Sequence, residues 1–358
     1  MTTNRRRRRA PAVRSASPRR RDGAPVPVDP GSPVLRWLLQ SDQPASRYRA
    51  LRDLLDRPDS EPEVRAARSA IPRTGWARTL LDRQRPAGHW RSPKDLYRPK
   101  YLSTIWNFQA LAELGVTRDH PPFARTCELF LDQYARSDGG FDSPPYPGEE
   151  GRASELCVTG NVTRALLLAG YGSDSRVRGA LEWLVRSQLP DGGWHCWPQI
   201  AFGRGTLDGW EALNAFAAVP PERRTRSMRG AIARGTEFYL RRGLMRQGPK
   251  EYRPWLRFHF PRHYYYDVLA GLDMLTALGE GADPRLDPAL DLLDAKRNDD
   301  GTWPIDRAHP DLGAGAGYRL PRATRPLVLE KAGRPSRWIT LTSLRVQRRV
   351  RSARGLAT

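Results

Sequence analysis

A short phrase that recurs at a nearly fixed interval constrains this sequence more than any other feature. In each copy a Gln or Lys is followed, a few residues later, by Gly, one further residue and an aromatic residue. The four copies end at Trp90, Phe141, Trp194 and Trp303, at intervals of 51, 53 and 109 residues. The last interval is about two periods, so a degenerate copy is expected near Gly248. A period of this length is typical of repeat architectures.

Helical patterns fill the intervals between the copies, with little sustained strand alternation. A helix with one polar face leads into each phrase, and a helix that is apolar over more of its circumference follows it, which predicts that the second helix lies further inside. The first helices are expected at 76–83, 123–134, 176–187, 228–241 and 288–297, and the second helices at 102–114, 155–169, 207–218, 264–278 and 336–349.

The region before the repeats has three parts. Residues 1–31, rich in Arg, Pro, Ser and Ala, are expected to form a disordered tail. The amphipathic stretch 34–55 predicts one helix, and the polar, Pro-interrupted segment 59–73 predicts a connection. Repeats need their neighbours for stability. We therefore expect one domain over residues 32–352, with the repeats at about 74–349.

The repeated phrase has a structural interpretation. Gly just past a helix end adopts the left-handed conformation that caps the helix, and a second Gly allows a tight reversal. The aromatic residue is expected to bury against the preceding helix end, where the Gln amide would pair with free carbonyl groups. A direct contact of these Trp and Gln residues with a ligand is the alternative.

The net charge of +21 comes mainly from arginine, since 55 of the 60 basic residues are Arg. Nine of these Arg lie within the first 21 residues, which contain no acidic residue. GC-rich codons explain such a bias, and we rank this explanation above the alternative. The alternative is that residues 5–21 bind nucleic acid or an anionic membrane.

Three cysteines, Cys127, Cys157 and Cys196, form neither a C-x-x-C pair nor a disulfide framework. This usage fits a reducing compartment and predicts a cytoplasmic location. No apolar run approaches the length of a membrane span. The Arg-rich start is not followed by an apolar core, so it is not a secretory signal.

Gln-x3-Gly-x-Trp at this period, between paired helices, resembles the squalene–hopene cyclase and protein prenyltransferase β-subunit superfamily. The resemblance covers about residues 74–349, and the chain is also similar to actinobacterial prenyltransferase/squalene oxidase repeat proteins. It implies an all-α fold of the α/α toroid type, with repeats of about 50–55 residues. In such a toroid, inner helices surround a central cavity and outer helices enclose them. An isoprenoid or similar apolar small molecule is the implied ligand.

In this architecture the repeat turns lead into the inner helices, so the helix N-termini would face one mouth of the cavity. Converging N-termini attract anions, and neighbouring arginines add charge-assisted hydrogen bonds. A diphosphate or carboxylate head group at the mouth is therefore expected. The candidate rim and cavity residues are Arg204, Asp208, Trp210, Arg262, Tyr264, Asp267, Trp106 and Trp338. For the aromatic ones, a place in the core is the alternative.

The resemblance also implies a catalytic zinc ion. The prenyltransferase family binds it with Asp-x-Cys at the start of one inner helix and a His from a later one. Here Glu155 and Cys157 stand where Asp-x-Cys would, and His263 opens a later inner helix. Thiolate, imidazole and carboxylate are zinc ligands. The alternative is structural, with Cys157 a small core residue and Glu155 an acid favoured by the helix dipole.

Two routes of terpene cyclisation lack their motifs, because neither Asp-x-Asp-Asp nor Asp-Asp-x-x-Asp occurs. The resemblance therefore implies a terpenoid cyclase/prenyltransferase-like toroid that, if catalytic, transfers a prenyl group rather than cyclising one. A protein prenyltransferase also needs a helical partner subunit. The alternative is a non-catalytic toroid that binds lipid or peptide, or serves as a scaffold. The aromatic-rich segment 251–266, which replaces the degenerate copy, is where binding is expected to concentrate.

Overall fold

The computed structural model describes residues 31–143, 151, 153–196, 202–309 and 328–356, and it is mostly helical, as predicted. No helix within these ranges is both long and apolar enough to cross a membrane. The α-helices are α1 (Pro33–Leu38), α2 (Pro44–Asp53), α3 (Pro62–Ala70), α4 (Gly75–Leu81), α5 (Thr104–Leu114), α6 (Pro121–Gln133), α7 (Leu156–Ala169), α8 (Ser175–Arg186), α9 (Glu211–Ala217), α10 (Arg226–Leu240), α11 (Val268–Leu278), α12 (Asp287–Ala295) and α13 (Arg337–Ala353). The shorter elements are η2 (Leu207–Gly209), η3 (Pro221–Arg223), β1 (Arg246–Gln247), β2 (Lys250–Glu251), η4 (Arg253–Leu256), η5 (Glu280–Ala282) and η6 (Pro284–Leu286).

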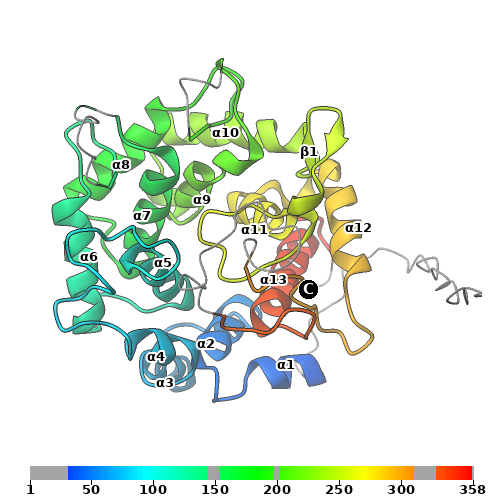
Figure 1. Ribbon diagram of the computed structural model, residues 1–358. Helices are drawn as coiled ribbons and strands as arrows, with labels where there is room; N and C mark the ends of the chain where they lie inside the picture. The colour runs from blue at the N-terminus through cyan, green and yellow to red at the C-terminus, as the bar shows by residue number, and fades with distance from the viewer. Residues whose placement is uncertain (1–30, 144–150, 152, 197–201, 310–327, 357–358) are drawn as a thin grey trace, which may run out of the picture.

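The helices that follow the repeat turns contact one another in chain order. α5 contacts α7, α7 contacts α9, α9 contacts α11, and α11 contacts α13. The circuit closes because α2 contacts both α13 and α4, and α4 contacts α5. Figure 1 shows these helices around the centre of the molecule. α11 and α13 are buried along almost their whole length, which agrees with the predicted inner position of the second helices.

Of the helices that precede repeat turns, α4 takes part in closing the circuit, whereas α6, α8 and α10 lie outside it (Figure 1). α6 contacts α5 and α7, α8 contacts α7 and α9, and α10 contacts α9 and α11. Each of these helices buries one stripe and leaves its polar face exposed, as α8 does with Val177, Ala180, Leu181 and Leu184. The outer helices therefore fill the grooves between successive inner helices.

Each of the four predicted turns is a five-residue loop with the same two backbone hydrogen bonds. In the loop 189–193, Leu189 N–H donates to the Gly193 carbonyl (2.9 Å), and Gly192 N–H donates to the Leu189 carbonyl (2.9 Å). The same bonds recur in the loops 85–89, 136–140 and 298–302. The fourth residue of every loop is a Gly with φ between +85° and +95°, a conformation that glycine adopts readily.

The aromatic residue of the turn satisfies the end of the preceding outer helix. In three copies the indole N–H donates to the backbone carbonyl ten residues earlier. These bonds are 2.7–3.0 Å long and join Trp90 to Leu80, Trp194 to Leu184 and Trp303 to Leu293. All three indoles are buried. Each one therefore packs in the core and also donates a hydrogen bond to a carbonyl group at a helix end.

The Gln amide has a different partner from the predicted one. Gln188 Nε2 donates to the Ala231 carbonyl in α10 (2.9 Å) and to the Gly192 carbonyl of its own turn (2.8 Å). Gln84 Nε2 likewise donates to the Pro122 carbonyl in α6 (2.8 Å). Because the indole already occupies the preceding helix end, the Gln of these two turns is free to join its turn to the next outer helix.

The region before the repeats differs from the sequence expectation in two places. Two helices, α1 and α2, occupy the stretch 34–55, because Pro44 begins α2 and disfavours helical geometry in the residue before it. A helix, α3, lies within 59–73, where a connection was expected. Pro62 occupies its first turn, and Val64 and Ala67 pack on Leu51 of α2. Tertiary contact with α2 thus stabilises a short polar helix.

The degenerate copy near Gly248 is a β-hairpin in which β1 pairs with β2. Residues 252–267 follow it and pass across the middle of the circuit before α11 begins (Figure 1). α11 begins at Val268, later than the predicted 264, because Asp267 caps it by accepting a hydrogen bond from Ala270 N–H (2.7 Å). We call residues 252–267 the crossing segment.

A glycine on α7 permits the close approach of α9. A Cβ atom at Gly160 would lie 2.6 Å from the Glu211 Cβ atom. We expect Gly160→Ala to lower the free energy of unfolding by about 1–2 kcal/mol, since overpacking outweighs the gain in helix propensity. Urea denaturation measures this. Gly172→Ala is the matched control, because its Cβ would meet only Leu167 at 3.5 Å. Equal stabilities of the two variants would contradict the expectation.

Candidate functional site

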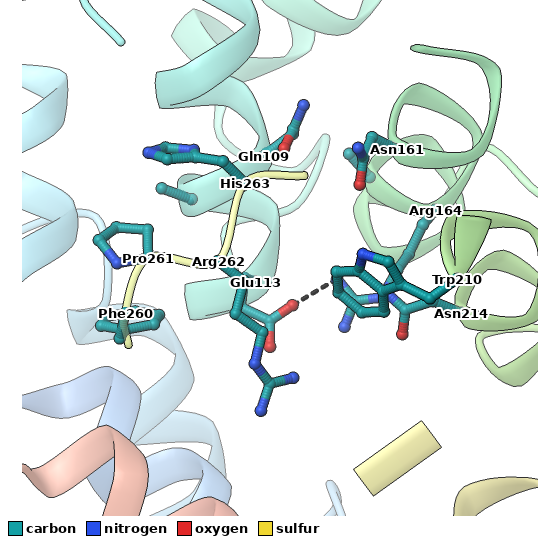
Figure 2. A pocket seen from close by; sticks show the side chains of 12 residues that line it. Gln109, Glu113, Asn161, Arg164, Trp210, Asn214, Phe260, Pro261, Arg262 and His263 are labelled. Carbon is teal, nitrogen blue, oxygen red and sulfur yellow. Dashed lines mark ion pairs between the residues drawn. The ribbon is translucent and has the colours of Figure 1, made fainter. Parts of the chain in front are cut away.

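A central pocket lies between the inner helices and the crossing segment. Its walls come from α5, α7, the start of α9 and residues 260–263. Figure 2 shows the segment 260–263 on one side and Asn161, Arg164, Trp210 and Asn214 on the other. The cavity volume is about 30 Å³, which is room for about two water molecules. In this conformation the pocket therefore accommodates a small polar group.

Three side chains of the pocket carry buried polar atoms without a hydrogen-bond partner. These atoms are Gln109 Oε1 from α5, and Arg262 Nη2 and His263 Nδ1 from the crossing segment. Arg262 is 9% exposed. Buried polar groups are nearly always paired with protein or water. Three such groups in one pocket therefore indicate that water or a ligand completes their bonding.

A network of buried charges adjoins this pocket and links four inner helices. Asp273 of α11 accepts hydrogen bonds from Arg345 Nε (3.0 Å) and Nη2 (2.7 Å) and from Arg349 Nη1 (3.0 Å). Arg262 Nη1 is also 3.4 Å from Asp273. Across the pocket, Glu113 of α5 pairs with Arg164 of α7 (Figure 2).

The arginines keep both pocket carboxylates ionised. Burial alone would raise the pKa of Asp273, but Arg345, Arg349 and Arg262 outweigh it and hold this pKa well below its usual range. Burial is likewise outweighed at Glu113, where Arg164 and Arg262 lower the pKa. The network is therefore charged at neutral pH, although it is enclosed by apolar helices.

An aromatic cluster lies behind the pocket. The Trp106 ring meets the His263 ring edge to face at 5.3 Å and the Tyr264 ring at 5.6 Å. The Tyr264 hydroxyl is 2.8 Å from the Tyr101 hydroxyl, which is also 3.1 Å from that of Tyr265. Trp210 lines the pocket itself, and its indole N–H donates to the Tyr264 carbonyl (3.2 Å). These rings hold the crossing segment against the inner helices.

His263 is held uncharged by this setting. Burial, and secondarily the neighbouring His259, lowers the pKa of His263 to about 3. In the unfolded chain its pKa is about 6.5, so the unfolded state binds this proton first on acidification. The stability contribution of neutral His263 is therefore complete above about pH 6.5 and declines as the pH falls toward 3.

We expect the free energy of unfolding to fall by roughly 1–2 kcal/mol between pH 7 and pH 5 on account of His263. Urea denaturation at both pH values measures the fall, with His263→Gln as the comparison. This variant lacks the titrating group, so its fall should be smaller by that amount. Identical falls in the two proteins would show that His263 is not buried as a neutral imidazole.

Asp267 has a structural role in this arrangement. Its carboxylate caps α11 and pairs with His259 Nδ1 at 2.9 Å. Both side chains are almost fully buried. Burial would raise the pKa of Asp267, but His259 and Arg262 outweigh it and lower the pKa. Asp267 therefore anchors the end of the crossing segment.

The three predicted zinc ligands do not form a metal site in the described chain. No group of three or more His, Cys, Asp or Glu side chains in the described ranges could hold a metal ion. Cys157 Sγ lies 4.0 Å from Glu155 Oε2, whereas His263 belongs to the central pocket. A hydrogen bond with Cys196, together with burial, raises the pKa of Cys157 well above its usual value. Glu155, Cys157 and His263 are therefore not gathered into one such group in the described ranges.

The remaining predicted residues lie away from the pocket lining. Arg204 is exposed, and Asp208 accepts a hydrogen bond from the Trp255 indole (2.9 Å). Trp338 is buried against Phe260, with ring centroids 4.9 Å apart. Of the eight predicted rim and cavity residues, Trp210 and Arg262 line the central pocket.

Sequence reasoning missed most of the polar lining. These residues are Gln109, Glu113, Asn161, Arg164 and Asn214. Each one lies on a helix that is mainly apolar, and the spacings within α5 and α7 place the pair from each helix on one face. A pair of polar residues three or four positions apart on an inner helix is therefore the signal that points to the pocket.

Glu211 is a second acid that the sequence did not single out. It begins α9 and is 1% exposed, and its Oε2 has no hydrogen-bond partner. Burial, and secondarily Cys157, raises the pKa of Glu211 well above its usual value. Burial between α7 and α9 therefore favours the uncharged form of the Glu211 carboxyl group.

Comparison with known proteins gives structural similarity alone. No family model matches the chain, and no curated protein matches it. A solved protein from Actinoplanes is 21% identical, with a TM-score of 0.43 and coverage of 87% of this chain and 90% of that chain. The type II terpene cyclase MstE from Scytonema, in its apo form, is 15% identical, with a TM-score of 0.42 and coverage of 87% of this chain and 88% of that chain. A variant of MstE in complex with geranylgeranyl dihydroxybenzoate is 16% identical, with a TM-score of 0.43 and coverage of 87% of both chains.

Proposed function

We propose that this protein is an α/α toroid that binds an isoprenoid or similarly apolar small molecule, with the polar end of the ligand in the central pocket. The support for the toroid is the circuit of helix contacts, which α2 and α4 close, together with the four matching turns. The observation that carries the function is that three residues lining one pocket at the centre of this circuit carry unpaired polar atoms. Small-molecule sites characteristically combine apolar walls with a few convergent polar groups.

The position of the pocket favours a ligand that displaces part of the crossing segment. The cavity volume of about 30 Å³ admits a head group and not an isoprenoid tail. Phe260 and Pro261 form the wall on the side of the crossing segment, and the Phe260 ring stacks on Trp338. Movement of this wall would expose apolar surface for the tail. Loops that cross a binding site commonly move when a ligand enters.

Farnesol titration tests the proposal. Trp210 lines the pocket, so a bound ligand should change its fluorescence in a saturable way. Trp210→Phe identifies the part of the signal that comes from this residue. Gln109→Trp fills the pocket from α5 and should abolish saturable binding in a folded protein. Binding that is equally strong in Gln109→Trp would place the ligand elsewhere, and absence of binding to the wild type would remove the isoprenoid proposal.

Binding and catalysis are separate questions, and a prenyl transfer role has the weaker support. The proposed ligand set for zinc is divided between two places in the described chain. We therefore favour a binding toroid, and a partner subunit or transferase activity would be additional to it. Incubation with farnesyl diphosphate and analysis of released diphosphate distinguishes the two. Turnover would establish an enzyme, whereas farnesol binding without turnover would support the binding toroid.

A further inference from the structure

One arginine beside the central pocket lacks a close counter-charge. The buried groups include four arginines (Arg164, Arg262, Arg345 and Arg349) and four carboxylates (Asp53, Glu113, Asp267 and Asp273). Asp267 is paired with His259, so the four arginines share the other three carboxylates. A buried charge without a close counter-charge is costly, so such an arginine is a recognition element for an anion.

The contacts identify this arginine as Arg262. Asp273 already accepts three shorter hydrogen bonds, two from Arg345 and one from Arg349. Arg164 is paired with Glu113. Arg262 makes one long contact of 3.4 Å to Asp273 through Nη1, and its Nη2 has no partner. Because this guanidinium is 9% exposed and lines the pocket, bulk water does not neutralise it.

We propose that the central pocket recognises a single carboxylate, which Arg262 anchors through its unpaired Nη2 group. This inference deepens the proposed function by naming the polar end of its ligand. A carboxylate accepts the fork of N–H groups that a guanidinium presents. The amides of Gln109, Asn161 and Asn214 lie in the same pocket and supply further hydrogen-bonding groups.

The magnitude of the charge selects a carboxylate over a diphosphate. A carboxylate brings one negative charge to the single unpaired guanidinium N–H group of Arg262, whereas a diphosphate brings about three, which one incompletely paired arginine does not offset. Glu113 is also a lining residue and remains ionised, so added negative charge would be repelled. The pocket volume of about 30 Å³ favours the smaller group as well.

Affinities for three farnesyl ligands test this anchor. Farnesoic acid, farnesol and farnesyl diphosphate share the tail and differ in the head group. We expect the wild type to bind farnesoic acid about tenfold or more tightly than farnesol, and more tightly than the diphosphate. In Arg262→Met this preference for the acid should disappear. Arg262→Lys keeps the charge without the fork and should retain part of the preference.

A ligand without an isoprenoid tail separates the two proposals. Sodium benzoate should raise the melting temperature of the wild type more than sodium chloride at equal ionic strength, and it should not do so in Arg262→Met. If no farnesyl compound binds but benzoate gives this difference, the isoprenoid function fails and the carboxylate anchor stands. Equal affinities for farnesol and farnesoic acid in the wild type would overturn the anchor and leave the isoprenoid function. Preference for the diphosphate, or a benzoate effect no larger than that of chloride, would also overturn the anchor.

Discussion

Replacing Asp273 with alanine is expected to lower the free energy of unfolding by about 3–5 kcal/mol, because it leaves buried arginines without their shared counter-charge. Asp273 is 9% exposed and Arg345 is 8% exposed, so solvent screens the pair little. The two residues join α11 to α13, and Arg345 continues the network to Asp53 of α2. Chemical denaturation of the full chain measures the loss.

A surface pair provides the control for this variant. Asp287 pairs with Arg354 at 2.6 Å, but its side chain is 51% exposed, so Asp287→Ala should cost at most about 1 kcal/mol. Acid should also reduce the effect of Asp273→Ala. The pKa of Asp273 is lowered in the folded protein, so its contribution is complete above the unfolded pKa of about 3.9 and is lost as the pH falls below that value. A similar small cost for both variants would show that the inner network is solvated.

Replacing Trp303 with alanine should cost about 3–5 kcal/mol, since it removes a large side chain from a closed core. Trp303 is fully buried, and its indole donates to the Leu293 carbonyl at 2.7 Å. Trp303→Phe keeps most of the ring volume and loses that hydrogen bond. Its expected cost is about 1–3 kcal/mol, because a carbonyl group at the end of α12 is left unpaired.

The equivalent tryptophan of another repeat tests whether the turns act independently. Trp194 makes the same bond to Leu184, in a distant part of the helix circuit. The losses in free energy of unfolding caused by Trp194→Phe and Trp303→Phe should therefore add in the double variant. Trp183 is only partly buried, and Trp183→Ala is the control for removing an indole outside a turn. A cost for Trp183→Ala equal to that of Trp303→Ala would contradict the special role of the turn residues.

The positions of the helix pairs followed from local patterns in the sequence. The repeated phrase marks turns whose geometry depends on residues within one short loop, such as Gly192 with its positive φ. The apolar periodicity of each helix depends only on residues a few positions apart. These local rules reproduced the order of outer and inner helices. They failed at α3, where packing on α2 stabilises a helix in a polar segment.

The central pocket depends on residues that are far apart in the chain. Gln109, Arg164 and Arg262 come from three different elements, and no local pattern states that their side chains meet. From the sequence, we expect the anion-binding residues at the mouth formed by the helix N-termini. The structure instead gathers Glu113, Arg164, Asp273 and Arg345 within or beyond the middle of their helices.

The repeat period and turn chemistry of this chain are written in its sequence, because glycine conformation, helix periodicity and aromatic burial act over short distances. The sequence does not show which partners the buried charges will have. A polar residue on an apolar helix costs free energy until a counter-charge is placed beside it. For Asp273, that counter-charge comes from α13, more than seventy residues later. Only closure of the helix circuit brings the two together, and the same closure leaves Arg262 facing the pocket with an unpaired group.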